Sequence, residues 1–488
     1  MVKKRIPSGT FDNDFLKGTV RNYPSLECLT QHQREDLDKR ISRLVDFESI
    51  AKVPFQVVDY ISKWISSKPE FEEKNISDDP EKDRKRKYYF IDPWGGGSMA
   101  IVREGNKNGN GLSKSSITEG FNLIVCHSDS PCLRLKPRPI KLEWDPEQRY
   151  NYLGVRLSAI AQGGLSVHQW LGQPVRIIGY KESRDGKRRL IEIPGFVPDT
   201  SAHIDYRGNQ EVNEAFPPEK SLEIITGHTG QEETLKKFGF RSPDDFAQSK
   251  FFAVPINNPI PIDEYSWRLL AGYGHDDRSC IYSAVDAIVK TRDPKRTAIV
   301  LITDREEIGD DAPSGAQGPF FDRVLDYIIE KEESDKDTEF SEKNRRRILY
   351  QSCMLIGDVG IAPSGHDYEQ MDVSNSPKLG FGVYIAADDS SSSNTGFISK
   401  LKYLAERGTS RGYNLFHQIS GNFYNQDKEQ VWFRSPEGKD SLYNRISQWA
   451  WVGIPCASAH SPSEIICPAD ELWTSRFYRR FLESDLSI

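Results

Sequence analysis

The stretch Thr297-Ala298-Ile299-Val300-Leu301-Ile302-Thr303-Asp304-Arg305-Glu306-Glu307-Ile308-Gly309 joins an apolar, β-branched run to two adjacent carboxylates. The run is typical of a buried strand, so the sequence predicts that Glu306 and Glu307 lie at the edge of a sheet. Where a strand gives way to a loop, neighbouring side chains point in different directions. One Glu can therefore bind a metal while the other faces a substrate as a proton acceptor, an arrangement that suits metal-assisted hydrolysis. For an isolated pair, a solvated strand end before a Gly turn is the alternative.

Other polar residues follow strand-like runs in the same way. His127 and Asp129 follow the run 121–126 and are two residues apart, so they face the same way and Asp129 can orient the His127 ring. Asp358 follows an apolar run that ends two residues earlier, and His460 follows the run 452–458. Taken singly, a turn explains Asp358 and an ordinary buried histidine explains His460.

The pair Asp276-Asp277 precedes a predicted helix, where capping of the helix N-terminus is the alternative explanation. Together with the strand-end residues, the pair gives five polar positions along an alternating α/β pattern. Open α/β sheets place their sites in the crevice outside the carboxyl ends of the strands. The sequence therefore predicts that these side chains meet in one metal-binding crevice.

The order of the predicted elements indicates an α/β fold with a mixed sheet covered by helices on both faces. Two amphipathic helices lie within 34–66, and a charged segment at 68–87 reads as a loop, as does the Glu- and Lys-rich run 330–347. The remaining elements are strands at 88–91, 99–102, 121–126, 297–303, 348–357, 379–386 and 452–458, and helices at 279–291, 319–331, 394–406 and 470–483. Short β-type segments with frequent Gly and Pro fill 137–261 and predict an inserted β-rich domain. The predicted domains are thus 1–136 and 262–488, which form one unit, and the insert at 137–261.

Composition narrows the functional classes. The chain has 488 residues, 65 Lys and Arg, 72 Asp and Glu and a net charge of −7, which argues against nucleic acid as the main partner. Its 7 cysteines lack paired CxxC spacing and fit reduced thiols. The basic N-terminus lacks the apolar core of a secretory signal, and no run approaches the ~18 apolar residues of a membrane span. We therefore expect a cytoplasmic protein that does not bind a membrane.

Four sequence blocks resemble, in order and spacing, the aspartyl aminopeptidase family of co-catalytic zinc peptidases. The first block alone matches over nearly twelve consecutive positions. The blocks are Cys126-His127-Ser128-Asp129-Ser130-Pro131-Cys132-Leu133-Arg134-Leu135-Lys136-Pro137, Asp276-Asp277-Arg278-Ser279-Cys280, Asp304-Arg305-Glu306-Glu307-Ile308-Gly309 with Gly315-Ala316-Gln317-Gly318, and Ala459-His460-Ser461.

The resemblance implies a metal-dependent aminopeptidase with two Zn²⁺ ions per subunit. One ion would be held by His127, Asp276 and Asp358, and the other by Asp276, Glu307 and His460. Glu306 would be the general base, and Asp129 would act beside it in catalysis. Nitrogen and oxygen ligands suit Zn²⁺ in a hydrolytic site, and Mn²⁺ or Co²⁺ would fit the same donors.

The resemblance also implies a peptide substrate and a homo-oligomer. In the family the inserted domain mediates dimerisation, which corresponds here to 137–261, and the dimers assemble into dodecamers. A histidine of that domain contacts the substrate in a neighbouring subunit, and His203 is the matching residue.

Three departures from the family pattern affect the expected substrate. The chain has Ile356-Gly357 before Asp358 where relatives have Ser-Ala. It lacks the Lys that relatives carry within 385–394 and the Gly-rich loop that they carry within 421–445. A preference for acidic N-terminal residues therefore stays open. Two rival functions also stay open: another amidohydrolase that uses the same two-metal site, and a non-catalytic, self-assembling cargo or scaffold protein.

Overall fold

The computed structural model describes residues 24–80, 83, 85–105, 117–141, 155–183, 186–199, 222–228, 230–262, 268–333, 341–365, 367–387, 392–407, 415, 417–420 and 445–486. The chain divides into two compact units. The first comprises residues 1–129, 259–459 and 463–488, and the second comprises 130–258 with 460–462. The insert was predicted at 137–261.

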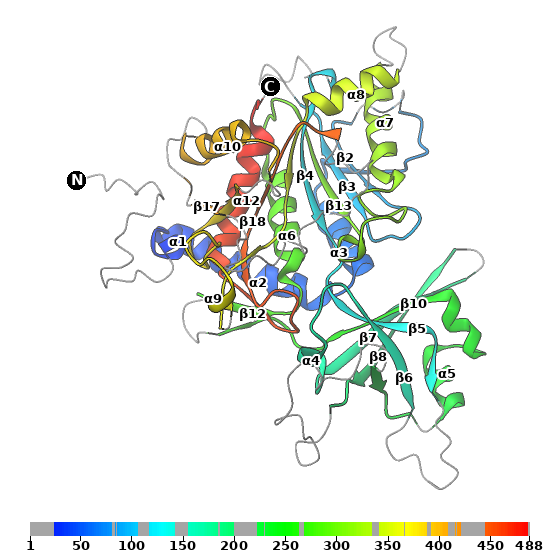
Figure 1. The fold of residues 1–488 in the computed structure, drawn as a ribbon. Coiled ribbons are helices and arrows are strands. Elements are labelled where there is room, and N and C mark those ends of the chain that lie inside the picture. The colour runs from blue at the N-terminus through cyan, green and yellow to red at the C-terminus, as the bar shows by residue number, and fades with distance from the viewer. Residues whose placement is uncertain are drawn as a thin grey trace. The chain divides into compact units, whose positions relative to one another are not determined.

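A mixed sheet forms the centre of the first unit (Figure 1). Its strands β13, β4, β14 and β18 are parallel neighbours, β3 and β16 flank this group antiparallel, and β2, β1 and β17 complete the two edges. In spatial order the strands are β1 (Glu72–Lys74), β2 (Lys87–Ile91), β3 (Met99–Arg103), β13 (Thr297–Thr303), β4 (Phe121–His127), β14 (Cys353–Ile356), β18 (Gln448–Gly453), β16 (Val383–Ala386) and β17 (His417–Ser420).

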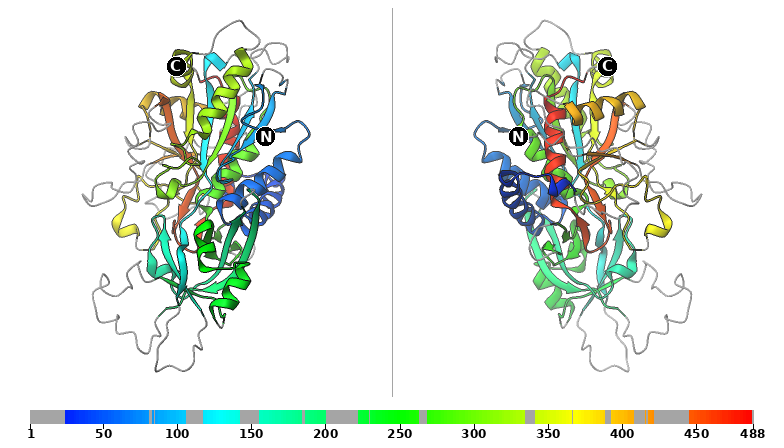
Figure 2. Two further views of the ribbon diagram at one scale, coloured as in Figure 1. Left: turned by 90° about the vertical axis from the view of Figure 1, so that its right-hand side faces the viewer. Right: turned by 90° about the vertical axis from the view of Figure 1, so that its left-hand side faces the viewer.

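Alternate residues of the strands point to opposite faces of this sheet, and each face has its own apolar core. In β13, for example, Val300 packs into one core while Ile299 and Leu301 pack into the other. Helices α2 (Gln31–Ile50), α3 (Pro54–Ser66), α6 (His275–Lys290), α10 (Thr395–Arg407) and α12 (Pro468–Glu483) cover the first face. Helices α7 (Pro319–Glu333) and α8 (Glu342–Gln351) cover the second, and the two sides can be compared in Figure 2. Both faces are therefore buried, as the long apolar runs predict.

A smaller sheet accompanies the large one in the first unit. Its strands are β11 (Ile260–Pro261), β12 (Leu270–Gly272), β20 (Glu464–Ile466), β19 (Pro455–Ala457) and β15 (Gly360–Ile361). The first unit also contains the short helices α1 (Pro24–Glu27) and α9 (Asp367–Gln370) and the 3₁₀ turns η3 (Ile117–Glu119) and η8 (Glu306–Ile308).

The second unit is a closed barrel of six strands. Their order is β10 (Ser249–Pro255), β5 (Cys132–Lys141), β6 (Arg156–Gln162), β9 (Glu223–Ile225), β8 (Arg188–Phe196) and β7 (Pro174–Glu182). Helices α4 (Val167–Trp170) and α5 (Gln231–Phe238) and the 3₁₀ turn η7 (Pro243–Gln248) complete the unit. Phe238 packs edge to face against both Phe246 and Phe251.

Two local predictions were wrong. Residues 348–352 were read as a strand and 342–347 as a loop, but α8 runs through Gln351, because Ser341 accepts a hydrogen bond from Asn344 N at 3.2 Å and caps its first turn. The charged segment 68–87 contains β1, which pairs in parallel with β2. The insert also contains α5, which ends at Gly239 in a left-handed conformation.

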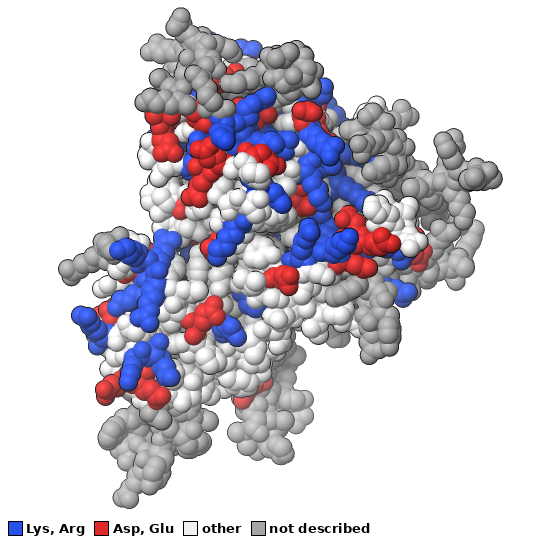
Figure 3. Space-filling view, turned by 180° about the vertical axis from the view of Figure 1, so that it is seen from behind, with Lys and Arg blue, Asp and Glu red and all other residues white. Residues whose placement is uncertain are grey.

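Charge and hydropathy agree with the composition. Positive and negative side chains are interspersed on the face in Figure 3. Of the helices that the structure describes, none combines the length and the apolar character needed to cross a bilayer. The seven cysteines, all of them within the described residues, form no disulfide bond.

Candidate metal centre

The topology of the sheet brings the predicted residues to one edge. Strands β13, β4 and β14 are parallel and adjacent, with Thr303 paired to His127 and Ile356 paired to Val125. Their carboxyl ends therefore carry His127, the Glu306-Glu307 pair and Asp358 to the same edge. The sequence predicts a metal-binding crevice at this edge.

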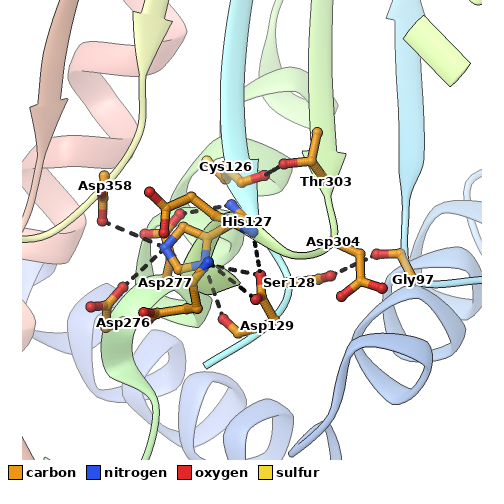
Figure 4. A network of polar contacts seen from close by, with 12 residues as sticks. Gly97, Cys126, His127, Ser128, Asp129, Asp276, Asp277, Thr303, Asp304 and Asp358 are labelled. Carbon is orange, nitrogen blue, oxygen red and sulfur yellow. Dashed lines mark hydrogen bonds and ion pairs between the residues drawn. The ribbon is translucent and has the colours of Figure 1, made fainter. Parts of the chain in front are cut away.

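His127 lies between a main-chain carbonyl and two carboxylates (Figure 4). Its Nδ1 is 3.0 Å from Asp129 O, while its Nε2 is 3.1 Å from Asp276 Oδ1 and 3.6 Å from Asp358 Oδ1. A carbonyl accepts only, so Nδ1 carries a hydrogen, and Nε2 faces the carboxylates. A metal that replaces the proton on Nε2 would bind the tautomer that a metal-binding histidine needs.

Two groups of side chains have ligand atoms close enough to share a metal ion. His127, Asp276 and Glu307 form one group, and Asp276, Asp277 and Asp358 form the other, with the ligand atoms of each group within 4.8 Å of one another. The residues fit divalent ions for two reasons. Nitrogen and carboxylate oxygen are the donors that Zn²⁺ binds in hydrolytic sites. In addition, Oδ1 of Asp277 is buried without a hydrogen-bond partner among the described residues.

The pKa values reflect the concentration of negative charge. Burial and the charge of Asp276 raise the pKa of Asp358, and burial raises the pKa of Asp277 far more. Burial lowers the pKa of His127, but its contacts with Asp129, Asp276 and Asp358 raise the pKa more, to well above its usual value. A bound cation would offset this repulsion and lower the raised pKa values, so that the carboxylates could bind it in their charged form.

Glu306 and Glu307 lie on a tight turn that Asp129 holds in place. Arg305 (φ 74°) and Gly309 (φ 103°) flank the turn in left-handed conformations. The two oxygens of the Asp129 carboxylate accept hydrogen bonds from Glu306 N at 3.1 Å and Glu307 N at 3.3 Å. Asp129 thus contacts the Glu turn with its carboxylate, and it contacts His127 Nδ1 with its main-chain carbonyl at 3.0 Å and with carboxylate Oδ1 at 3.6 Å.

Glu306 itself has an unusual protonation equilibrium. Burial raises its pKa to about 8, with further contributions from Asp358, Asp310 and Asp129 that outweigh the opposing charge of His127. A carboxyl group of this kind exchanges a proton near neutral pH, as a general base must.

The segment that carries Asp276 departs from helical geometry at the start of α6. Asp276 (φ −78°, ψ 107°) and Asp277 (φ −114°, ψ 21°) are non-helical, and the peptide bond between them is cis. Asp276 N donates to Glu464 Oε2 at 3.0 Å, and Asp277 Oδ2 accepts from His127 N at 3.1 Å. Asp276 is therefore held through its main-chain amide and Asp277 through its carboxylate, and the ligand atoms of both lie within 4.8 Å of each other.

The family model of the aminopeptidase I zinc metalloproteases (M18) matches residues 47–411. The chain belongs to the M18 family. A probable M18 family aminopeptidase 1 from Thermotoga maritima is 30% identical over 400 residues, which span 75% of this chain and 81% of that protein. The crystal structure of an M18 aminopeptidase from Thermotoga maritima aligns with a TM-score of 0.75 at 23% identity, over 95% of this chain and 99% of that one. The mApe1 dodecamer of S. cerevisiae aligns with a TM-score of 0.68 at 15% identity, over 92% and 97%.

Membership of M18 makes the chain a metal-dependent aminopeptidase, a peptide hydrolase. The predicted fold class is confirmed, because the M18 structures share this mixed α/β fold with its β-rich insert. The family model describes zinc metalloproteases, which agrees with the ligand groups.

The ligand groups of this M18 enzyme differ in composition from the predicted sets. In the structure His127 belongs to the same ligand group as Glu307. Asp277, which the sequence analysis does not name as a ligand, belongs to the same group as Asp358. Asp277 could have been named from its adjacency to Asp276. Glu464, which accepts the hydrogen bond from Asp276 N, is a further residue that the sequence does not reveal. Nothing in the run Ser463-Glu464-Ile465, four residues after His460, indicates a contact with α6.

The remaining two predicted residues lie elsewhere. His460 belongs to the second unit, has a left-handed backbone (φ 65°), and its Nδ1 is 3.1 Å from Gly164 O. Neither of the ligand groups found among the described residues includes it. His203 lies outside the described residues.

Proposed function

We propose that this M18 aminopeptidase holds two zinc ions that share Asp276, and that Glu306 is its general base. The observation that supports the proposal most directly is that Asp276 belongs to both groups of ligand atoms. When bound, a pair of zinc ions lowers the pKa of a water and polarises the scissile carbonyl of a peptide.

The chain's own residues divide the remaining work. In this assignment His127 and Asp358 would hold one ion and Glu307 the other, each together with Asp276, which shares a ligand group with all three. His460 is the fifth ligand; its Nδ1–H contact with Gly164 O places the lone pair on Nε2, the tautomer required for metal binding. Mn²⁺ or Co²⁺ would fit these nitrogen and oxygen donors as well.

Glu306 takes the proton from the attacking water and gives it to the departing amine. Its place next to a ligand on the same turn, and its pKa of about 8, support this role. Bound cations lower that pKa, so the carboxylate form would prevail at neutral pH. Asp129 acts in catalysis by fixing the turn that carries Glu306.

The substrate is a peptide with an unblocked N-terminus. The family resemblance suggests acidic N-terminal residues, with His203 as a further contact supplied by a neighbouring subunit. Because the chain lacks the Lys and the Gly-rich loop of its relatives, the preference for acidic residues stays open.

The inserted barrel is proposed as the dimerisation domain of a homo-oligomer in the cytoplasm. The fold shared with the mApe1 dodecamer supports an assembly of dimers up to a dodecamer, and the role of 137–261 rests on the same resemblance.

The test uses peptides that begin with Asp, Glu, Leu or Ala, each with Zn²⁺, Mn²⁺ or Co²⁺, and N-acetylated versions as controls. The proposal expects the first amino acid to be released from unblocked peptides only. Faster cleavage of the acetylated peptides would contradict an aminopeptidase. Activity that survives exhaustive removal of metal would contradict the zinc centre.

A further inference from the structure

A second buried pair of side chains lies directly beside the proposed metal ligands. Glu48 of α2 and His275, the first residue of α6, are both fully buried, and His275 Nδ1 is 2.9 Å from Glu48 Oε1. The other ring nitrogen, Nε2, is 3.2 Å from Leu270 O in β12. His275 therefore connects α6 to a helix and to a strand of the smaller sheet.

Packing leaves the ring little room to move. A Cβ at Gly272 would lie 3.2 Å from His275 Cε1 and 3.0 Å from Pro259, so glycine permits this close approach. Oε2 of Glu48 has no hydrogen-bond partner among the described residues, so His275 is the hydrogen-bonding side chain that the structure gives this buried carboxylate. A buried polar pair of this kind fixes both partners, because either one alone would be costly.

The position of the pair matters because Asp276 is the next residue. Its backbone is non-helical, so the intrahelical hydrogen bonds of α6 do not by themselves set its direction. Consecutive Cα atoms are about 3.8 Å apart, so a shift of His275 moves Asp276 with it. Metal ligands must be placed to within about 0.2 Å of ideal distances, which makes the centre sensitive to such a shift.

We propose that Glu48 and His275 are positioning residues that aim the shared ligand Asp276 at the metal centre. The inference rests on the proposed two-zinc function. Neither residue touches substrate or a reacting atom in this scheme. Their effect passes through the backbone at position 276 to the carboxylate.

The structure also supplies a matched control. Helices α2 and α6 are in contact, and a second polar pair joins them. At the other end of α6, Asp286 accepts from Arg40 of α2 at 2.5 Å and from Ser475 at 2.7 Å. This pair joins the same two helices and is similarly buried, but it lies ten residues from Asp276. A role in helix packing alone predicts that both pairs behave alike.

The experiment compares full-length, zinc-loaded proteins equilibrated with buffers of graded free Zn²⁺, with bound zinc measured by atomic spectroscopy and the melting temperature measured in parallel. The variants are Glu48→Leu, Glu48→Gln, the double variant Glu48→Leu with His275→Phe, and the control Asp286→Asn. The double variant replaces both polar groups by apolar ones, so it avoids an unpaired buried charge and keeps the test valid if Glu48→Leu does not fold.

The proposal expects zinc affinity to fall about 10- to 100-fold in Glu48→Leu and in the double variant, the range for groups that orient metal ligands. Glu48→Gln keeps an oxygen acceptor for His275 Nδ1 and should recover most of that loss. Asp286→Asn should lower the melting temperature and leave zinc affinity within about twofold.

Unchanged zinc affinity in the double variant would overturn the inference, as would a loss in Asp286→Asn equal to that in Glu48→Leu. Both results leave the proposed function intact. A wild-type protein that binds no zinc would instead overturn the proposed function and, with it, the inference.

Discussion

Replacing Asp129 with Asn tests the link between the two halves of the centre. The two carboxylate oxygens of Asp129 accept separate hydrogen bonds, one from Glu306 N at 3.1 Å and one from Glu307 N at 3.3 Å. Asn has one oxygen, so one of the two amides would lose its acceptor and face an NH₂ group instead. A hydrogen bond to a charged group contributes about 1.5 to 3 kcal/mol. At about 1.4 kcal/mol for each factor of ten, kcat should fall about 10- to 150-fold.

The same variant should bind nearly the normal amount of zinc. The shorter contact of His127 Nδ1 with position 129, at 3.0 Å, uses the main-chain carbonyl, which Asn keeps, whereas carboxylate Oδ1 is 3.6 Å away. The assay is steady-state cleavage of an unblocked peptide at saturating Zn²⁺, with bound zinc measured in the same samples. Asp372→Asn is the control, because Asp372 also accepts a main-chain amide, Ser374 N at 3.0 Å, but on an exposed loop. A kcat within twofold of wild type for Asp129→Asn would refute the reasoning, and a large loss of zinc would place the defect at His127.

Three further predictions concern stability and assembly. Burial raises the pKa of Asp286, but Arg40 and Lys290 outweigh it and lower the pKa to about 2. Because the folded pKa is depressed, this contribution of about 2 kcal/mol is present above pH ~4 and is lost as the pH falls toward 2, and Asp286→Asn should flatten acid unfolding in that window. Leu301→Ala, at a fully buried position of β13, should cost about 2 to 5 kcal/mol in urea unfolding, and a cost below about 1 would contradict the packing described. Deleting 140–255 should abolish assembly and activity together, and a monomeric wild-type protein by light scattering would contradict the proposed role of the insert.

The sequence was most informative where one local pattern determined the outcome. The run before Thr303 is apolar at every position, and both faces of β13 are buried, so strand type and the placement of Glu306 and Glu307 followed directly. The same reading failed at 348–352, because the short apolar runs on either side of Gln351-Ser352 do not by themselves distinguish the end of a helix from the start of a strand. The break falls at Ser352, whose hydroxyl donates to Ile348 O.

Contacts between distant residues were beyond such a reading. Glu48 and His275 are 227 residues apart in the chain, and neither position stands out from its neighbours. The hydrogen bond between Asp129 and Glu306 N joins residues that are 177 positions apart in the chain. The sequence predicts that Asp129 orients His127, but it does not predict this second contact. The fold supplies these contacts, whereas the ligand types were already visible as polar residues at strand ends.

Glu306→Gln and Glu307→Gln, compared by zinc titration and peptide cleavage, test the central assignment most directly. Gln keeps the shape of Glu but cannot take a proton, so Glu306→Gln should bind zinc normally and lose about 10²- to 10⁴-fold in kcat. Glu307→Gln should bind zinc more weakly and regain part of its activity at high Zn²⁺. Activity that excess zinc restores in Glu306→Gln but not in Glu307→Gln would contradict the account and reverse the two roles.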